Sequence, residues 1–398
     1  MSARRPRPRA PFAAPLVARA LAVAALAALA LAAAPRAGAA DWSLAPQLAL
    51  GGEYNTNPYL DYRQVDHRSG GTLDLNLPLA AKTERTDFSL ALGGHLRRYD
   101  NDPNANRDDE TLNLSVGQTR ERSGWKASAG WTRDTTLTSE LGSTGITVGN
   151  QRHNRYQASI APQIQLSARS LFVFGVSGEL NRYDSAASTG LVDYGYASVY
   201  ATYARQATEI TSVGLSLMAG GLSVPDRRAS ESVNGVVRLT FNHQFSERLS
   251  LEADAGPSFA RSRTLERWGA SGLLALKYGG QRTDFSLSAE HALAPAGLGS
   301  LTLHDSVALG MGNRLTEKVS IGTTVGYQRS SDALYATSAA RRSTNYWRAS
   351  ESLRWQWTET FSVSLSAGAT RQHSSDQADH ANQFIGGLRF GWSPRSLF

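Results

Sequence analysis

The sequence contains no cysteine among its 398 residues. This absence excludes disulfide bonds, thiolate metal ligands, thiol-based catalysis and the lipid-modified cysteine of a lipoprotein. It also suits a protein that crosses an oxidising compartment unfolded, because the chain has no thiol that could be oxidised on the way. Stability and chemistry must therefore come from other side chains.

Long apolar runs are scarce, since a single one is found and it lies near the amino terminus. Residues 20–34 are almost entirely alanine and leucine, five arginines precede them, and Gly38-Ala39-Ala40 follows. This pattern predicts a secretory signal peptide at residues 1–40, cleaved after Ala40, followed by one domain at 41–398. A membrane anchor is the alternative, but the run is shorter than the roughly 20 apolar residues that a spanning helix needs.

A large excess of charge of one sign is absent from the predicted mature chain. Six of the 41 basic residues lie in residues 1–40, which hold no acidic residue, so 35 basic and 34 acidic residues remain. The basic balance of the full sequence belongs mainly to the signal peptide. It therefore gives no reason to expect nucleic acid as a partner.

Helical periodicity of useful length is also missing after Ala40. Instead, segments of about ten residues alternate apolar and polar side chains, with turn-forming residues between them. The leucines of 73–79, for example, share one face, whereas Asp74 and Asn76 face the other way. By the same reasoning Tyr194, Tyr196 and Tyr200 are expected on an apolar face. Glu351 has the parity of its neighbouring tryptophans, so it is expected to face outward with them.

The connections between the segments alternate in length. Brief gaps such as 82–87 and 120–124 alternate with longer gaps rich in Asn, Asp, Gly and Ser, such as 55–69 and 138–152. Short periplasmic turns and long external loops are typical of outer-membrane barrels. The pattern predicts an all-β, closed, antiparallel transmembrane β-barrel of about 18 strands with both termini in the periplasm. Sixteen strands, or a soluble propeller or β-helix, are the alternatives.

The last segment, residues 384–398, alternates most strongly. Phe384, Leu388, Phe390, Trp392 and the terminal Phe398 share one parity, and small or polar residues fall on the other. Such an aromatic face is stable against lipid. The terminal Phe398 resembles the carboxy-terminal signature of bacterial outer-membrane barrels. This resemblance implies that the outer-membrane insertion machinery and outer-membrane lipid are partners, and that the protein is located in the bacterial outer membrane.

Polar side chains occupy the face opposite the apolar one, and we expect them to line the lumen. The candidates are Asp74, His95, Arg97, Lys126, Gln163, Gln165, Arg238, Glu252, Asp254, Glu290, Arg354 and Arg389. The interior of an 18-strand barrel is wide enough for water unless it is plugged. Because the candidates have mixed signs, they predict weak ion selectivity. The alternative is that they pair with one another and brace the wall.

Catalytic, metal and cofactor motifs are not recognisable. The eight histidines are scattered, and His304 and Asp305 are adjacent on a strand, so their side chains should point to opposite faces. Asp376, Asp379 and His380 share one loop, where a solvated loop is favoured over a weak cation site. We therefore expect no enzyme activity, no cofactor and no metal. A rim site that includes His95 and Glu290 is kept as the enzyme hypothesis.

The first external loop carries a distinctive motif. Strand residues ending in Tyr54-x-x-Asn57 precede a polar loop, within Gly51-Gly52-Glu53-Tyr54-Asn55-Thr56-Asn57-Pro58-Tyr59. This opening resembles that of outer-membrane porins found with exopolysaccharide-synthesis systems, although those have an Asp/Asn-Asn pair where this chain has Asn55-Thr56-Asn57. The resemblance implies polysaccharide as a partner, with Tyr54, Asn55, Asn57 and Tyr59 as candidate contacts.

Two main interpretations of function follow. The first is a passive, porin-like outer-membrane channel for small hydrophilic solutes or exopolysaccharide. The second is a structural or adhesive surface barrel that binds an extracellular partner through long loops such as 55–69 and 138–152.

Overall fold

The computed structural model describes residues 40–62, 66–100, 102–143, 150–184, 190–225, 231–334, 343–375, 377 and 379–395. The chain divides into two compact units, Met1–Asp41 and Trp42–Phe398. Nearly all of the predicted signal peptide, together with Phe398 and Asp376, lies outside the described residues.

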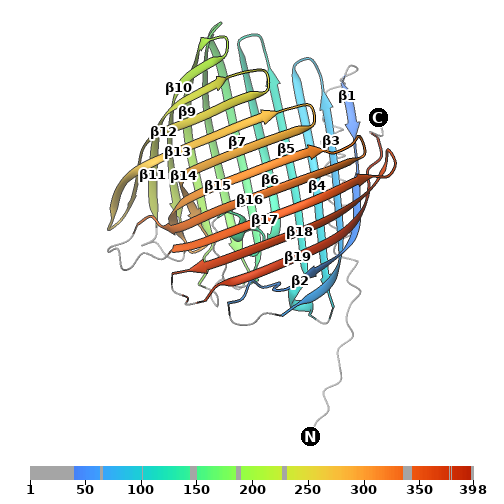
Figure 1. The fold of residues 1–398 in the computed structure, drawn as a ribbon. Helices are drawn as coiled ribbons and strands as arrows, with labels where there is room; N and C mark the ends of the chain where they lie inside the picture. The colour runs from blue at the N-terminus through green and yellow to red at the C-terminus, as the bar shows by residue number, and fades with distance from the viewer. Residues whose placement is uncertain are drawn as a thin grey trace. The chain divides into compact units, whose positions relative to one another are not determined.

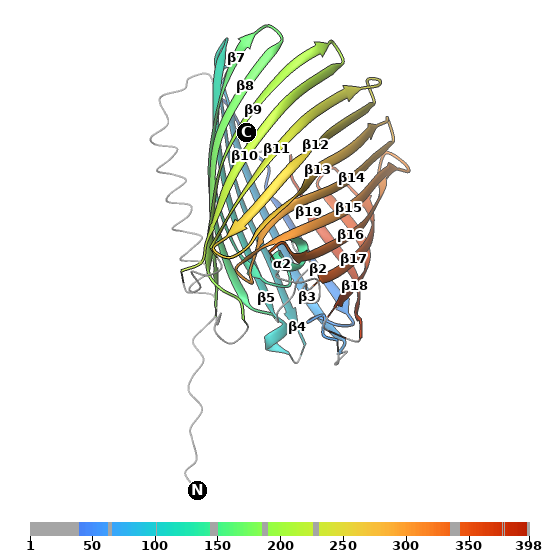
Figure 2. The same ribbon diagram turned by 90° about the vertical axis from the view of Figure 1, so that its left-hand side faces the viewer.

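Eighteen strands, β2 to β19, form one closed antiparallel ring within the second unit (Figure 1; Figure 2). Each strand pairs with its neighbours in sequence, and the ring closes where β19 pairs with β2, from Trp392 with Leu48 to Ile385 with Asn55. The predicted fold of 18 strands is therefore confirmed, and the 16-strand and propeller alternatives are wrong.

The ring strands have these bounds: β2 Gln47–Asn55, β3 Arg68–Lys82, β4 Thr86–Tyr99, β5 Arg107–Thr119, β6 Ser123–Thr135, β7 Arg152–Ser167, β8 Ser170–Tyr183, β9 Tyr194–Thr208, β10 Thr211–Ser223, β11 Ser232–Gln244, β12 Leu249–Ser262, β13 Glu266–Gly279, β14 Thr283–Ala296, β15 Ser300–Arg314, β16 Val319–Asp332, β17 Ser343–Gln356, β18 Phe361–Ser374 and β19 Ala381–Trp392. A short extra strand, β1 (Asp41–Leu44), pairs with β3. Pro46 separates β1 from β2, because proline has no N–H for the strand ladder.

The two ends of the barrel differ in their connections. Brief turns join β3 to β4, β5 to β6 and each later pair as far as β17 and β18, and the longer connections lie at the other end. We call these the turn end and the loop end. Two short helices, η1 (Pro103–Ala105) and α2 (Ser139–Ser143), belong to the loop end. No helix in the described part of the chain is long and apolar enough to span a membrane.

The outer face of the ring is apolar. Leu239 is 71% exposed and Leu50 is 55% exposed, although both lie within strands. Exposed aromatic side chains gather towards both ends of the strands: Trp125, Tyr278, Trp355, Trp357 and Trp392 towards the turn end, and Tyr54, Tyr156, Trp268, Trp347 and Phe384 towards the loop end. This is the arrangement that an apolar belt between two interfaces requires.

The tyrosines of β9 depart from the predicted pattern. Tyr194 is buried, Tyr196 donates a hydrogen bond to Asn234 Oδ1 at 3.1 Å, and the ring of Tyr200 lies over Gly175 on the inner face. The expectation that these three tyrosines face lipid is therefore wrong. The outward positions beside them hold Gly, Ala and Val, and the tyrosine of β9 that faces outward is Tyr203. A tyrosine accepts an inward position because its hydroxyl finds a polar partner there.

Glu351 faces outward, as its parity predicts. It pairs with Thr323 of β16 and Ala367 of β18, on the same face as Trp347 and Trp355. The side chain is exposed and lies near the middle of β17. A carboxylate at this depth would be mildly destabilising against lipid.

Candidate functional site

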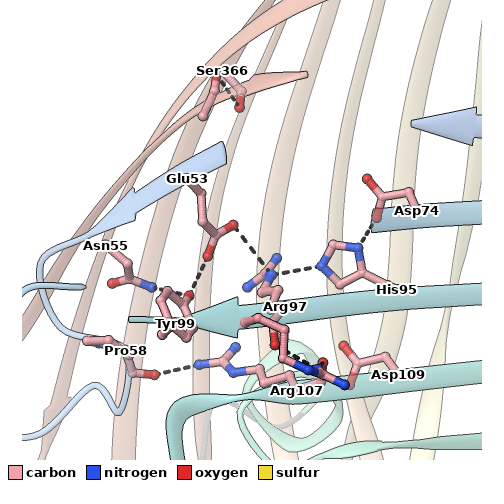
Figure 3. A network of polar contacts seen from close by, with 12 residues as sticks. Glu53, Asn55, Pro58, Asp74, His95, Arg97, Tyr99, Arg107, Asp109 and Ser366 are labelled. Atoms are coloured by element: carbon pink, nitrogen blue, oxygen red, sulfur yellow. Dashed lines mark hydrogen bonds and ion pairs between the residues drawn. The ribbon is translucent and has the colours of Figure 1, made fainter. Parts of the chain in front are cut away.

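A polar network covers the inner face where the last strand meets the first ones (Figure 3). Of the predicted lumen residues, Asp74, His95, Arg97 and Arg389 meet here. Asp74 and His95 are register partners on β3 and β4, and Arg389 of β19 lies across the closing seam. Residues from both ends of the chain thus form one cluster.

His95 is the centre of this network. Arg97 Nε donates to His95 Nε2 at 2.7 Å, while His95 Nδ1 contacts Asp74 Oδ1. Because Nε2 accepts a hydrogen bond, the proton lies on Nδ1, and the ring is a neutral imidazole that donates to Asp74. Asp74 Oδ2 is in turn 3.5 Å from Arg389 Nη1. The contacts therefore bind β3, β4 and β19 together.

Glu53 connects this cluster to the first loop. It is 7% exposed, lies 3.4 Å from Arg97 Nε and accepts a hydrogen bond from the Tyr99 hydroxyl. Asn55 Nδ2 donates to the same hydroxyl at 3.3 Å, and the Arg107 guanidinium donates to the carbonyl of Pro58. A buried carboxylate is stable only with such partners. These contacts support the bracing interpretation for this part of the wall.

The other predicted lumen residues share the inward parity but lie apart. Arg238 Nη1 is 3.5 Å from Asp254 Oδ2, and Arg238 Nη2 donates to Ser271 Oγ at 2.7 Å. The remaining six, at dispersed positions around the ring, are Lys126, Gln163, Gln165, Glu252, Glu290 and Arg354. Within the described ranges, none of these six forms an ion pair. They are therefore available to water or solutes.

The β6–β7 connection folds into the barrel. Leu137 and Leu141 pack with Leu60, Tyr346 of β17 and Ala381, and we call this group the loop cluster. Since β6 and β17 are far apart around the ring, a segment that joins them must cross the interior. Figure 2 shows α2 inside the ring of strands.

Polar contacts fix the position of α2. The Tyr183 hydroxyl of β8 donates to Glu140 Oε1, and the backbone N–H of Gly297, between β14 and β15, donates to Glu140 Oε2 at 3.4 Å. Thr138 Oγ1 donates to Asp109 Oδ2 at 3.3 Å. One short segment thus contacts the wall on several sides and narrows the interior near the loop end.

A second apolar group fills part of the loop end. Its buried members are Tyr183, Leu191, Val192, Tyr194, Leu222, Val224, Ala260, Leu301 and Ala333. They come from strands and from three connections, so the described residues of these connections pack on one another and on the strands. Burial of this size holds the loop end in one arrangement.

Two recesses lie at the seam, one towards the loop end and one towards the turn end. One of about 360 Å³ is lined by Glu53, Arg97, Thr138, Arg348 and Arg389, among others. The other, about 450 Å³, is lined by residues that include Asp74, His95, Arg354 and Trp392. In the described structure Arg348 and Arg354 have no ion-pair partner, so both recesses carry available positive charge. Arginine is well suited to binding carboxylate or phosphate groups.

The first-loop candidates mainly anchor the loop. Asn57 Nδ2 donates to the carbonyls of Asp61, at 2.9 Å, and Asn382, at 3.1 Å, so the loop is fixed to β19. The Tyr59 hydroxyl donates to Asp102 Oδ2 at 2.9 Å, and burial together with this contact raises the pKa of Tyr59 to about 12.

Tyr54 is not part of that arrangement. It faces outward and pairs in register with Ser69 and Gly386. The four candidates therefore do not form one surface.

The predicted orientation of His304 and Asp305 is confirmed. His304 and Asp305 point to opposite faces, as predicted: His304 Nδ1 is 3.4 Å from Ser330 Oγ inside, and Asp305 contacts His291 outside. Among the described residues, no group of histidines and carboxylates has the arrangement of a metal site.

Several residues of the site were missed from the sequence. Glu53, Arg107 and Arg348 lie on the inward parity of their strands, so strict alternation would have found them. Glu140 lies in a long connection without periodicity. No signal in the sequence indicates that this loop turns inward.

No protein-family model matches the sequence, and no curated protein matches it. Among solved structures, OccAB4 of Acinetobacter baumannii is 9% identical with a TM-score of 0.49, covering 90% of this chain and 100% of that chain. OccK1 (OpdK) of Pseudomonas aeruginosa is 13% identical with a TM-score of 0.48, covering 88% and 99%. The FrpB iron transporter of Neisseria meningitidis is 10% identical with a TM-score of 0.45, covering 84% and 62%. At these values the similarity assigns no function and no residue-level correspondence.

Proposed function

We propose that this protein is a bacterial outer-membrane channel that passes small hydrophilic solutes by diffusion. The observation that carries the proposal is the division between the two faces of one closed ring: apolar side chains outside and polar, partly unpaired side chains inside. Only a closed barrel satisfies all strand hydrogen bonds within lipid. The first ring strand, β2, begins at the turn end, and the last, β19, ends there. We assign the turn end to the periplasm.

The cargo we favour is a small anion. Arg348 and Arg354 line the two recesses without ion-pair partners, whereas the neighbouring carboxylates Glu53 and Asp74 already contact arginines. The inward β6–β7 segment leaves less room for a polymer, so we favour small solutes over exopolysaccharide. The adhesive alternative needs loops that reach outward, and the described residues of this loop pack inward instead.

The test is electrical. Purified full-length protein in planar bilayers should give discrete conductance steps, and a salt gradient should give a reversal potential that shows a preference for anions. A folded barrel that stays silent would contradict the channel, whereas a cation preference would contradict the assigned cargo. Recognition of Phe398 by the insertion machinery stays a prediction.

A further inference from the structure

The wall of the barrel is incomplete between β13 and β14 near the loop end. These strands pair from Gly279 with Asp284 to Gly272 with His291, and no further. Beyond that point β13 continues to Glu266, paired only with β12, and β14 continues to Ala296, paired only with β15. All residues of both strands are described, so residues 266–271 and 292–296 face each other without a ladder.

Side chains hold the two strands at the point where they separate. Ser271 Oγ donates to the backbone carbonyl of His291 at 3.1 Å and accepts from Arg238 Nη2 at 2.7 Å. Arg238 is in turn 3.5 Å from Asp254. A side-chain hydroxyl thus replaces the next ladder bond. Unpaired strand edges are costly in lipid, so a wall that keeps this opening must offer the edges water or a ligand.

A small cavity passes through the wall at this place. Its volume is about 140 Å³. Ser258, Ala260 and Asp332 line it from the inner face, and Trp268 and His291 line it from the outer face. Leu293 also lines it and packs against the second apolar group. The opening therefore joins the apolar outer face to the polar side chains of Ser258, Arg267 and Asp332, beside the second apolar group of the loop end.

An apolar groove on the outer face leads to the same opening. It has a volume of about 350 Å³, and its outward lining comes from β8 to β13: Phe174, Val199, Leu217, Val237, Phe259 and Trp268. Trp268 is 68% exposed and borders both the groove and the cavity. The rings of Phe259 and Trp268 lie 5.6 Å apart and form the wall nearest the opening.

We propose that this opening is a side port for an amphiphile with a single alkyl chain, such as a fatty acid. The chain lies in the apolar groove, and the polar head group enters the gap between β13 and β14 towards Ser258 and Arg267. A cavity of about 140 Å³ admits a small head group such as a carboxylate, which favours a fatty acid over a phospholipid with its larger head group. The inference rests on the proposed membrane location and not on the conductance or cargo of the central channel.

The residue best suited to test the port is Gly269. It lines the cavity, and a Cβ at this position would come no closer than 3.5 Å to Ser258 Oγ, so Gly269→Leu fills the opening without a backbone clash. Gly326→Leu is the matched control. Gly326 faces the interior from β16, away from the port, and a Cβ there would come no closer than 3.9 Å to another atom.

The experiment uses the full chain in lipid nanodiscs with palmitate that carries a photoreactive diazirine. After illumination, mass spectrometry should find the label on peptides that contain Trp268 and His291. We expect Gly269→Leu to reduce that labelling at least fivefold and Gly326→Leu to leave it unchanged. Labelling spread evenly around the barrel, or unchanged in Gly269→Leu, would overturn the port.

Two further measurements separate the possible failures. A photoreactive phosphatidylcholine that labels the same peptides equally well would overturn the single-chain assignment. Planar-bilayer conductance of the same preparation tests the channel independently. Conductance without specific labelling contradicts the port alone, and specific labelling of a silent barrel contradicts the channel alone.

Discussion

The two ends of this barrel are built from the same strands but differ in their connections and in what fills the interior. At the turn end, brief connections such as that between Thr83 and Thr86, closed by a 2.9 Å backbone hydrogen bond, leave the interior free. At the loop end, the β6–β7 segment and two apolar groups pack inside the ring. The turn end thus only completes the wall, whereas the loop end narrows the interior.

The difference also explains where buried polar contacts gather. Glu53, Asn55, Asn57 and Glu140 are all buried and all lie towards the loop end, where each has partners from other elements. Strand pairing is enough to hold a hairpin in lipid. A loop held inside water-accessible space needs side-chain partners, because its backbone has no ladder.

Removal of the inward β6–β7 connection should have the largest effect, because it would make the loop end more like the turn end. Replacing residues 137–150 by a short Gly-Ser linker should raise single-channel conductance by roughly two- to threefold, because a segment that narrows the interior would be lost. The matched control replaces turn 120–122 at the other end by the same linker chemistry and should leave the conductance unchanged. An unchanged value in the loop variant would show that α2 does not lie in the conducting path.

Removal of positive charge from the two recesses should have the next largest effect. Arg348→Gln with Arg354→Gln should lower the anion-to-cation permeability ratio by about threefold, because both side chains carry charge without a partner. The reversal potential in a potassium chloride gradient measures this. Lys277→Gln removes a positive charge from the inner face near the turn end and should change the ratio less. An equal effect of Lys277→Gln would show that the two recesses at the seam do not determine the preference.

Loosening the loop should produce a smaller effect. Glu140→Gln weakens the hydrogen bonds that Glu140 accepts from Tyr183 and Gly297. One hydrogen bond to a charged group typically contributes about 1.5–3 kcal/mol to stability. We expect faster proteolysis within 136–151 and greater open-channel noise. Glu179→Gln, which affects the ion pair of Glu179 with Arg155 in the wall, should leave the cleavage rate of this loop unchanged.

The smallest effect concerns the wall itself. Glu351→Leu should stabilise the folded barrel by about 1 kcal/mol, because it removes a carboxylate from the apolar face. Denaturant unfolding in lipid vesicles measures this change. Glu252→Leu, on the inner face, should give no gain. Destabilisation by Glu351→Leu would show that this carboxylate has a partner, such as a second copy of the protein.

The ring itself was predictable from the sequence, because a strand that separates lipid from water must alternate. The leucines of 73–79 and the alternation of 384–392 give strand, face and order directly. The tyrosines of β9 were misassigned because tyrosine is stable in both environments, and Tyr203 of the same strand does face outward. The inward position of Tyr196 depends on its hydrogen bond with Asn234 of β11, and the residue types of β9 do not reveal this contact.

The site was less predictable than the ring. Parity identified Asp74, His95, Arg97 and Arg389 as inward, but it could not show that Asp74 and Arg389, which lie more than 300 residues apart, come within 3.5 Å. The inward fold of the β6–β7 connection and the separation of β13 from β14 depend on contacts between distant segments. Neither leaves a periodic signal in the residues that make it.

Closure between the first and last ring strands has a consequence for biogenesis. Gly52 finds its partner Leu388 only after almost the whole chain has been made, so every shorter translation product has two free strand edges. Non-local pairing of this kind also slows folding. The cell must therefore keep the nascent polypeptide shielded until synthesis ends, and a premature stop codon anywhere before β19 would yield material fit only for degradation.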